Sequence, residues 1–301
     1  MKTHFERAIF LSWYCGRGDC KFCYMSTQKS KIKEPRKARR SKESILAEAF
    51  LCKQFGWKIE FLSGGYEVFT SLELLEIIKG VFEIYGEKLW LNIGALSKKE
   101  LEMFKPYIQG VCGTVECVNP KVQRQVCPSK PVSEILTMFE HADKLGLKKC
   151  ITIVLGIGES LEDISLLINF IKEHNIDKIT FYRLKPQKET VFENTKPITA
   201  EYYVEWVKAA RDNFPKLNIV VGSWLDQLDE INLLLKAGAN AVTKFPSIKK
   251  FGSKYAIKIE EQAKKAGRKF EGTLTKMPKI SLNELDDKVK EKVNDYLKSL
   301  K

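Results

Sequence analysis

Residues 13–24 read Trp13-Tyr14-Cys15-Gly16-Arg17-Gly18-Asp19-Cys20-Lys21-Phe22-Cys23-Tyr24, directly after the first predicted strand. Three thiolates this close together can hold three irons of a [4Fe–4S] cube and leave the fourth iron open to a substrate or cofactor. Glycine reaches backbone conformations closed to other residues, so the two glycines let the loop curl round a cluster. A zinc site with His4 is the alternative, but zinc sites usually contain a second cysteine or histidine pair, which this chain lacks.

Outward from this loop, short apolar segments alternate with longer amphipathic ones. The predicted strands are rich in Ile, Val, Leu and Phe, as strands buried on both faces should be. They are Ala8–Trp13, Lys58–Leu62, Leu89–Ile93, Gly110–Cys117, Lys149–Leu155, Lys178–Leu184, Leu217–Gly222 and Asn240–Lys244. The predicted helices are Ser41–Phe55, Ser71–Tyr85, Ser97–Tyr107, Val132–Leu145, Leu161–His174, Ala200–Asn213 and Asp226–Ala237. Eight strands without a linker-like stretch favour an α/β fold, a single (β/α)8 TIM-type barrel, over a doubly wound open sheet.

The last segment of the chain differs from the rest. Residues 246–301 are mostly charged and helical in pattern. We therefore assign residues 1–245 to the barrel and residues 246–301 to a C-terminal extension packed on it.

Polar and glycine-rich motifs follow several of these strands. Besides the cysteine loop they are Gly64-Gly65-Tyr66-Glu67, Glu116-Cys117, Gly156-Ile157-Gly158-Glu159 and Arg183 to Pro186. In a barrel of this type the site lies at the carboxyl ends of the strands. The motifs are thus expected on one face.

The chain has a formal net charge of +13, and its densest basic stretch, Lys29–Arg40, follows the cysteine loop. A lysine-rich solvated surface is the simplest interpretation, and an acidic partner protein attracted by the charge is the sharper one. Aromatic residues are not interleaved with the stretch, which disfavours a nucleic acid. Eight cysteines and no apolar secretion signal predict a reducing, cytoplasmic location, and no apolar run reaches the ~20 residues that span a membrane.

Together these motifs resemble those of radical S-adenosylmethionine (SAM) enzymes. The resemblance lies in the cysteine triplet with Phe22 before its last member, the Gly-Gly-x-Glu after the second strand and the Gly-x-Gly-Glu after the fifth. The usual family spacing is C-x3-C-x2-C, and here one extra residue separates Cys15 from Cys20. The resemblance implies that the open iron binds SAM and that reductive cleavage of SAM gives a 5′-deoxyadenosyl radical, which abstracts hydrogen.

The resemblance also implies roles for single residues. Cys15, Cys20 and Cys23 would ligate the cluster, and Phe22 would pack on the adenine side of SAM. Other cofactor contacts would come from Gly64, Gly65 and Glu67 toward the methionyl ammonium, from Glu116, and from Gly156 and Gly158 beside the adenosine.

Within this family the chain looks most like the biotin synthase group. The similarity lies in Lys149–Glu159, in Glu162-Asp163 and in Lys236 to Asn240. Cys150 falls where biotin synthase places one ligand of its sulfur-donating [2Fe–2S] cluster. Phe61, Asn92 and Val220 stand where its other ligands belong, so biotin synthase itself is not predicted.

Three further cysteines, Cys112, Cys117 and Cys127, form the pattern C-x4-C-x9-C. They are candidate ligands of a second [4Fe–4S] cluster, with Cys150 or an exogenous group as the fourth ligand. Positions 112 and 117 face opposite sides of a regular strand, so such a cluster requires a β-bulge or an early end of the strand. The alternative is that these are small buried residues, as free cysteine often is.

The expected function is radical SAM chemistry followed by sulfur insertion into an aliphatic chain, since the chain resembles a component of the archaeal two-protein lipoyl synthases. The expected partners are an acidic acyl-carrier or lipoyl-carrier protein, a second radical SAM subunit and an electron donor. A maturase for a metal cofactor or an amino acid, without sulfur insertion, is the main alternative. RNA modification, argued from charge alone, and a non-catalytic iron–sulfur sensor are the others.

Overall fold

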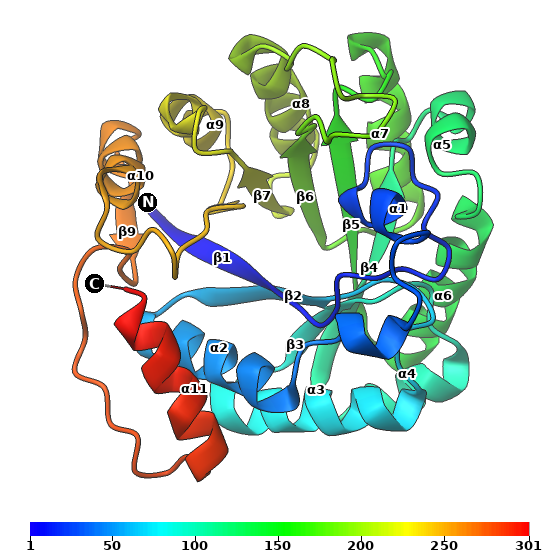
Figure 1. The fold of residues 1–301 in the computed structure, drawn as a ribbon. Helices are drawn as coiled ribbons and strands as arrows, with labels where there is room; N and C mark the ends of the chain where they lie inside the picture. Colours follow the sequence, from blue (N-terminus) through cyan, green and yellow to red (C-terminus); the bar gives the residue numbers. More distant parts are fainter. Residues whose placement is uncertain (301) are drawn as a thin grey trace.

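The computed structural model describes residues 1–300 as a closed barrel of parallel strands (Figure 1). Its strands are β1 (Lys2–Phe10), β2 (Lys58–Ser63), β3 (Leu89–Asn92), β4 (Ile108–Glu116), β5 (Lys148–Leu155), β6 (Lys178–Arg183), β7 (Asn218–Gly222) and β8 (Ala241–Thr243). Each strand pairs with the next, and β1 pairs with both β2 and β8. This closure confirms the (β/α)8 TIM-type barrel and excludes the open sheet.

Helices connect the strands on the outside of the barrel (Figure 1). The α-helices are α1 (Tyr24–Gln28), α2 (Lys42–Phe55), α3 (Ser71–Tyr85), α4 (Lys98–Phe104), α5 (Pro120–Val126), α6 (Val132–Leu145), α7 (Ile164–Glu173), α8 (Ala200–Asn213) and α9 (Ile231–Lys236). The 3-10 helices are Pro35–Ala38, Leu161–Asp163 and Leu228–Glu230. Local sequence explains the bounds of α3, which begins at a capping box between Thr70 and Glu73 and ends at Gly86 in the left-handed region.

The predicted bounds of the first strand, Ala8–Trp13, are wrong at both ends. β1 begins at Lys2, and Trp13 already belongs to the loop after it. The first half of β1 was not predicted because it contains the charged Glu6, and a strand buried on both faces is expected to be apolar. Glu6 is nevertheless buried, and its carboxylate lies 2.5 Å from Nζ of Lys178 on β6.

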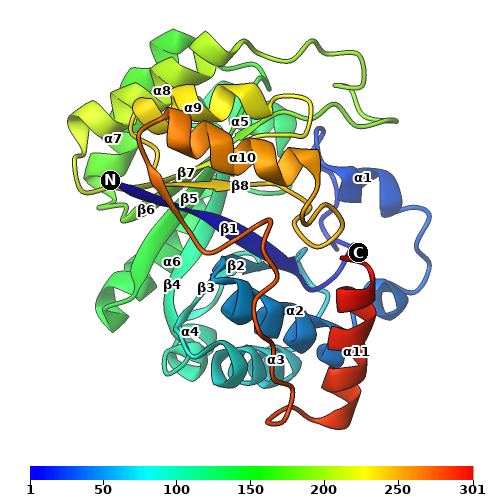
Figure 2. The same cartoon turned by 90° about the vertical axis from the view of Figure 1, so that its left-hand side faces the viewer.

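The C-terminal segment forms α10 (Lys254–Lys265), β9 (Lys269–Glu271) and α11 (Asp287–Lys298). β9 pairs with the first residues of β1, α10 contacts α9, and α11 contacts α2 (Figure 2). The hydroxyl of Tyr296 on α11 lies 2.7 Å from that of Ser44 on α2. In residues 1–300 no helix has the length and apolar character needed to cross a membrane.

Candidate active site

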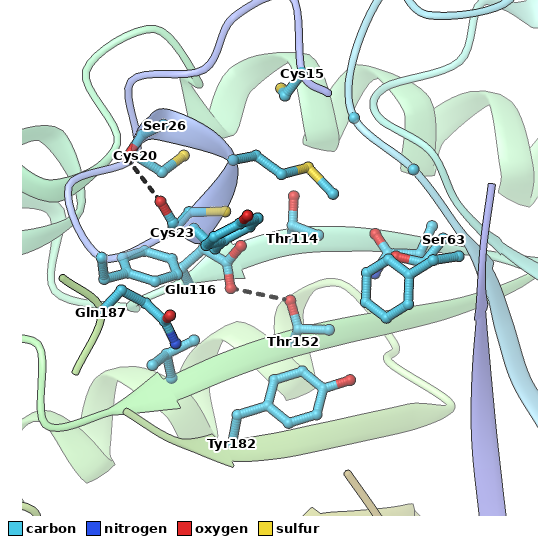
Figure 3. A pocket seen from close by; sticks show the side chains of 18 of the residues that line it. Cys15, Cys20, Cys23, Ser26, Ser63, Thr114, Glu116, Thr152, Tyr182 and Gln187 are labelled. Carbon is cyan, nitrogen blue, oxygen red and sulfur yellow. Dashed lines mark hydrogen bonds between the residues drawn. The ribbon is translucent and has the colours of Figure 1, made fainter. Parts of the chain in front are cut away.

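A cavity of about 320 Å³ lies where the carboxyl ends of the strands meet the cysteine loop (Figure 3). Aromatic side chains make up much of its wall, among them Phe10, Phe61, Tyr182 and Trp224. Polar groups reach it from the successive strands β2 to β5: Ser63, Asn92, Thr114, Glu116 and Thr152. An apolar wall with a few convergent polar groups is typical of a small-molecule site.

The cysteine loop covers this cavity, and Cys15, Cys20 and Cys23 all line it (Figure 3). The loop is tied to the segment after β2 by the N–H of Gly16, which donates to the carbonyl of Tyr66 at 2.8 Å. Sγ of Cys15 accepts from the N–H groups of Gly18 at 3.5 Å and Tyr66 at 3.4 Å. These two hydrogen bonds hold the Cys15 sulfur between its own loop and the segment after β2.

These residues fit a [4Fe–4S] cluster. Within residues 1–300 no three metal-ligating side chains are close enough to share one ion. A cubane does not need that, because each cysteine ligates a different iron. Burial raises the pKa of the Cys23 thiol to about 11, so cluster binding would release a proton there.

The two glycines after β2 differ in what surrounds them. A Cβ on Gly65 would collide with the carbonyl oxygen of Tyr14 and would come within 2.5 Å of Cα of Cys15, whereas the nearest atom to a Cβ on Gly64 is 3.7 Å away. Gly65 thus allows the closest approach of the two loops. Glu67 is exposed and lies outside the cavity wall, and its contact with SAM stays a prediction.

Glu116 lies at the end of β4, where the register with β5 shifts between Gly113 and Glu116. Its φ is 64°, a backbone conformation that is uncommon for residues other than glycine and is often found at functional sites. The carboxylate accepts from Lys130 at 2.8 Å and from Thr152 at 3.2 Å. Burial lowers the pKa of Lys130, but Glu116, Cys20 and Cys127 together more than compensate, so that this pKa is raised well above its usual value.

The other predicted SAM contacts, Phe22, Gly156 and Gly158, differ in their position relative to the cavity. Phe22 lines the cavity, whereas Gly156 and Gly158 do not. Both glycines have positive φ, 100° and 122°, and the carboxylate of Glu159 accepts from the N–H groups of Gly156 and Ile157 at 2.6 and 3.0 Å. Glu159 therefore shapes this loop, and the contact of the glycines with adenosine stays a prediction.

The remaining candidate cysteines make separate contacts. Cys112 and Cys150 are buried, and their sulfur atoms lie 3.3 Å apart. Cys127 hydrogen-bonds Cys20 and thereby lowers the pKa of the Cys20 thiol, and burial raises the pKa of Cys117 to about 12. The register of β4 shifts between Gly113 and Glu116, and the strand ends at Glu116, before Cys117. The irregularity that a second cluster requires is thus present, but a second cluster at Cys112, Cys117 and Cys127 stays a prediction.

Several cavity residues were not predicted from the sequence. They are Ser63, Thr114, Lys130, Thr152, Tyr182 and Lys244. Ser63 directly follows a predicted strand, and Lys244 ends one. Thr114, Thr152 and Tyr182 lie within predicted strands, so a search of whole strands and the residues after them for polar side chains would have found these five. Lys130 lies between α5 and α6, and nothing in its local sequence indicates that it is buried.

Comparisons with known proteins agree with this site. The chain is 46% identical over 272 residues to an uncharacterized protein of Methanocaldococcus jannaschii, covering 90% of this chain and 75% of that protein. It is 32% identical to the 7,8-didemethyl-8-hydroxy-5-deazariboflavin synthase of Archaeoglobus fulgidus, covering 62% and 58% of the two chains. It is 26% identical to the biotin synthase of Methanococcus maripaludis, covering 56% and 51%. The chain thus spans little more than half the length of these two enzymes.

Among solved structures, the fold is similar to that of methylornithine synthase, with a TM-score of 0.69, 20% identity, and coverage of 98% of this chain and 82% of the other. Residues 13–171, which contain the cysteine loop and the segments after β2, β4 and β5, match the Radical SAM superfamily. The biotin synthases are distant relatives. This match over more than half of the sequence, and the three cysteines that line one cavity, show that the chain belongs to the radical SAM superfamily.

Proposed function

We propose that this radical SAM enzyme abstracts hydrogen from a small molecule held inside the barrel and does so without inserting sulfur. When bound at Cys15, Cys20 and Cys23, the cluster supplies the electron that cleaves SAM to methionine and a 5′-deoxyadenosyl radical. The observation that supports the proposal is the set of cysteines at the cavity. Among the described residues, the cavity is lined by the three cysteines of the loop and by no others.

A sacrificial sulfur source would have to lie within reach of the substrate radical. Cys112, Cys117 and Cys127 are absent from the cavity wall, and each is almost fully buried. Cys112 contacts Cys150, and Cys127 contacts Cys20. Because these cysteines contact different partners, they favour hydrogen abstraction with one cluster over sulfur insertion with two.

The residues of the cavity would bind and orient the substrate. Ser63, Asn92 and Thr152 offer hydrogen-bonding groups from β2, β3 and β5. Phe61 and Tyr182 offer apolar faces. The cysteine loop covers the cavity and excludes water from it. The exclusion of water protects a carbon radical from side reactions. The pair of Glu116 with Lys130 fixes the wall between these groups.

Sulfur insertion is the second candidate, with a lipoyl-synthase-like reaction on an acidic carrier protein and a second radical SAM subunit as partner. Two observations support it: the distant similarity to biotin synthase and the buried pair of thiols at Cys112 and Cys150. The basic stretch Lys29–Arg40 is weaker support for binding of an acidic carrier protein than its sequence alone suggested, because some of its charges are paired within the chain. Arg39 pairs with Glu73, and Arg40 with Glu48.

Anaerobic reconstitution with iron, sulfide and SAM separates the two candidates. The proposal predicts about four irons per chain, and two clusters would give about eight. It also predicts that a Cys112→Ala, Cys117→Ala, Cys127→Ala variant keeps the iron content and the 5′-deoxyadenosine yield of the parent. Loss of half of the iron in that variant would instead support sulfur insertion.

A further inference from the structure

Five cationic side chains line the cavity, and four of them are neutralised. Ion pairs join Arg17 to Glu134, Lys130 to Glu116, Arg183 to Glu230 and Lys185 to Asp226. The fifth is Lys244, whose ammonium group has no carboxylate within ion-pair distance in residues 1–300. A buried or partly buried charge is costly unless it is paired, so this lysine lacks the partner that the other four have.

The surroundings of Lys244 direct it into the cavity. It follows β8 with a φ of 67°, a strained conformation for a residue with a long side chain. Its ammonium nitrogen lies 4.3 Å from the centre of the Tyr182 ring and 5.7 Å from that of Phe10. Gly222 makes room for this arrangement, because a Cβ there would come within 2.8 Å of Cγ of Lys244 and 2.7 Å of the Tyr182 ring.

The buried acid Glu60 does not supply the missing charge. Its two carboxylate oxygens are already engaged, by the hydroxyl of Tyr182 at 2.5 Å and by the hydroxyl of Thr243 at 2.6 Å. Burial also raises the pKa of Glu60, which weakens it as a counter-ion. A negatively charged molecule that enters the cavity can supply the ion-pair partner that Lys244 lacks in residues 1–300.

We propose that Lys244 recognises a carboxylate group of the substrate. This inference rests on the proposed function and adds to it the chemical class of the substrate: a small molecule with a hydrogen-bonding body and one negative charge. A single unpaired cation favours a singly charged carboxylate over a phosphate dianion, whose second charge would remain unpaired. The aromatic rings of Phe10 and Tyr182 beside the ammonium group fit the apolar part of such a substrate next to its carboxylate.

The test measures binding and does not depend on turnover. Reconstituted protein with SAM is titrated with straight-chain carboxylates from acetate to octanoate, with the matching amides and with methyl phosphate, and binding is followed by calorimetry. We expect at least one carboxylate to bind the parent protein, and at least tenfold weaker binding of it to Lys244→Met. We expect Lys244→Arg to retain most of this binding and the matching amide to bind parent and Lys244→Met alike.

Lys250→Met is the matched control, since Lys250 lies 5.8 Å from the ring centre of Tyr255 and is outside the cavity wall. It should bind the carboxylate as the parent does. The proposal is overturned if no carboxylate binds the parent, if Lys244→Met binds it equally well, or if methyl phosphate is the ligand that depends on Lys244. It is also overturned if Lys244→Met loses affinity for SAM instead, because the lysine would then serve the cofactor. Iron content and circular dichroism of each variant exclude misfolding. Failure of the proposed function would show separately, as absence of 5′-deoxyadenosine from the parent.

Discussion

Nζ of Lys130 lies 2.8 Å from Oε1 of Glu116, and both side chains are buried at the wall of the cavity. The pair joins the segment between α5 and α6 to the end of β4, where Glu116 has its left-handed backbone. Lys130 also donates to Thr114 at 3.0 Å. The ion pair therefore fixes an edge of the site that lies far from the cysteine loop in sequence.

Removal of one partner should destabilise the fold strongly. In Lys130→Met the Glu116 carboxylate remains buried without its counter-ion, so we expect the free energy of unfolding to fall by roughly 3–5 kcal/mol. Lys98→Met is the control, because Lys98 pairs with Glu102 at 3.6 Å on the exposed surface of α4, where a pair contributes about 0–1 kcal/mol. Urea denaturation followed by tryptophan fluorescence measures both. Equal losses for the two variants would contradict the account of this pair.

The pair of Glu6 with Lys178 predicts an acid-sensitive barrel. Burial raises the pKa of Glu6, but Lys178 and His4 more than offset this and bring it down to about 2 from an ordinary value of 4.5. A carboxyl group with a depressed pKa stabilises the fold fully above pH 4.5, and that stabilisation is lost as the pH falls toward 2. The loss over this window is on the order of 3 kcal/mol.

Unfolding free energies measured from pH 6 to pH 2 should therefore decline less steeply in Glu6→Gln than in the parent, although this variant starts from a lower value because Lys178 loses its partner. Glu76→Gln, which alters an exposed pair with Lys42, should follow the parent. A parallel decline of all three proteins would mean that Glu6 does not control the acid limb.

Substitution by alanine should lower iron binding at Gly65 but not at Gly64, the two adjacent glycines after β2. Gly65→Ala places a Cβ against Tyr14 and Cys15 and should force the loop after β2 away from the cysteine loop. We expect this variant to retain less than half of the parent's iron after reconstitution. Gly64→Ala meets its nearest atom at 3.7 Å and should retain iron close to the parent level. If both variants bind iron like the parent, contact between the two loops is not needed to hold the cluster.

Much of the fold follows from the sequence because the barrel strands are short, apolar and regularly spaced. Ser71–Tyr85, Val132–Leu145 and Ala200–Asn213 were predicted with the bounds that the structure has, since their amphipathic patterns are long. The cysteine loop was also predicted from local sequence, because its three cysteines lie within nine consecutive residues.

The missed parts depend on contacts between distant segments. Glu6 belongs in a buried strand because Lys178, on another strand, neutralises it. Lys130 belongs to the site because the bulge in β4 brings Glu116 to it. Lys244 is notable because four other cations have partners and it has none in residues 1–300, a comparison that only the assembled cavity allows. No sequence pattern encodes such pairings directly.

We expect the three cysteines of the loop to hold a cluster that cleaves SAM. The decisive measurement is the yield of 5′-deoxyadenosine per chain from anaerobically reconstituted, dithionite-reduced protein, compared between the parent, Cys20→Ala and Cys52→Ala. Cys52 is buried on α2, away from the cavity, and so provides the matched control. We expect 5′-deoxyadenosine from the parent and from Cys52→Ala, and none above background from Cys20→Ala. A Cys20→Ala variant with the parent's yield, or a fully reconstituted parent that releases none, would contradict it.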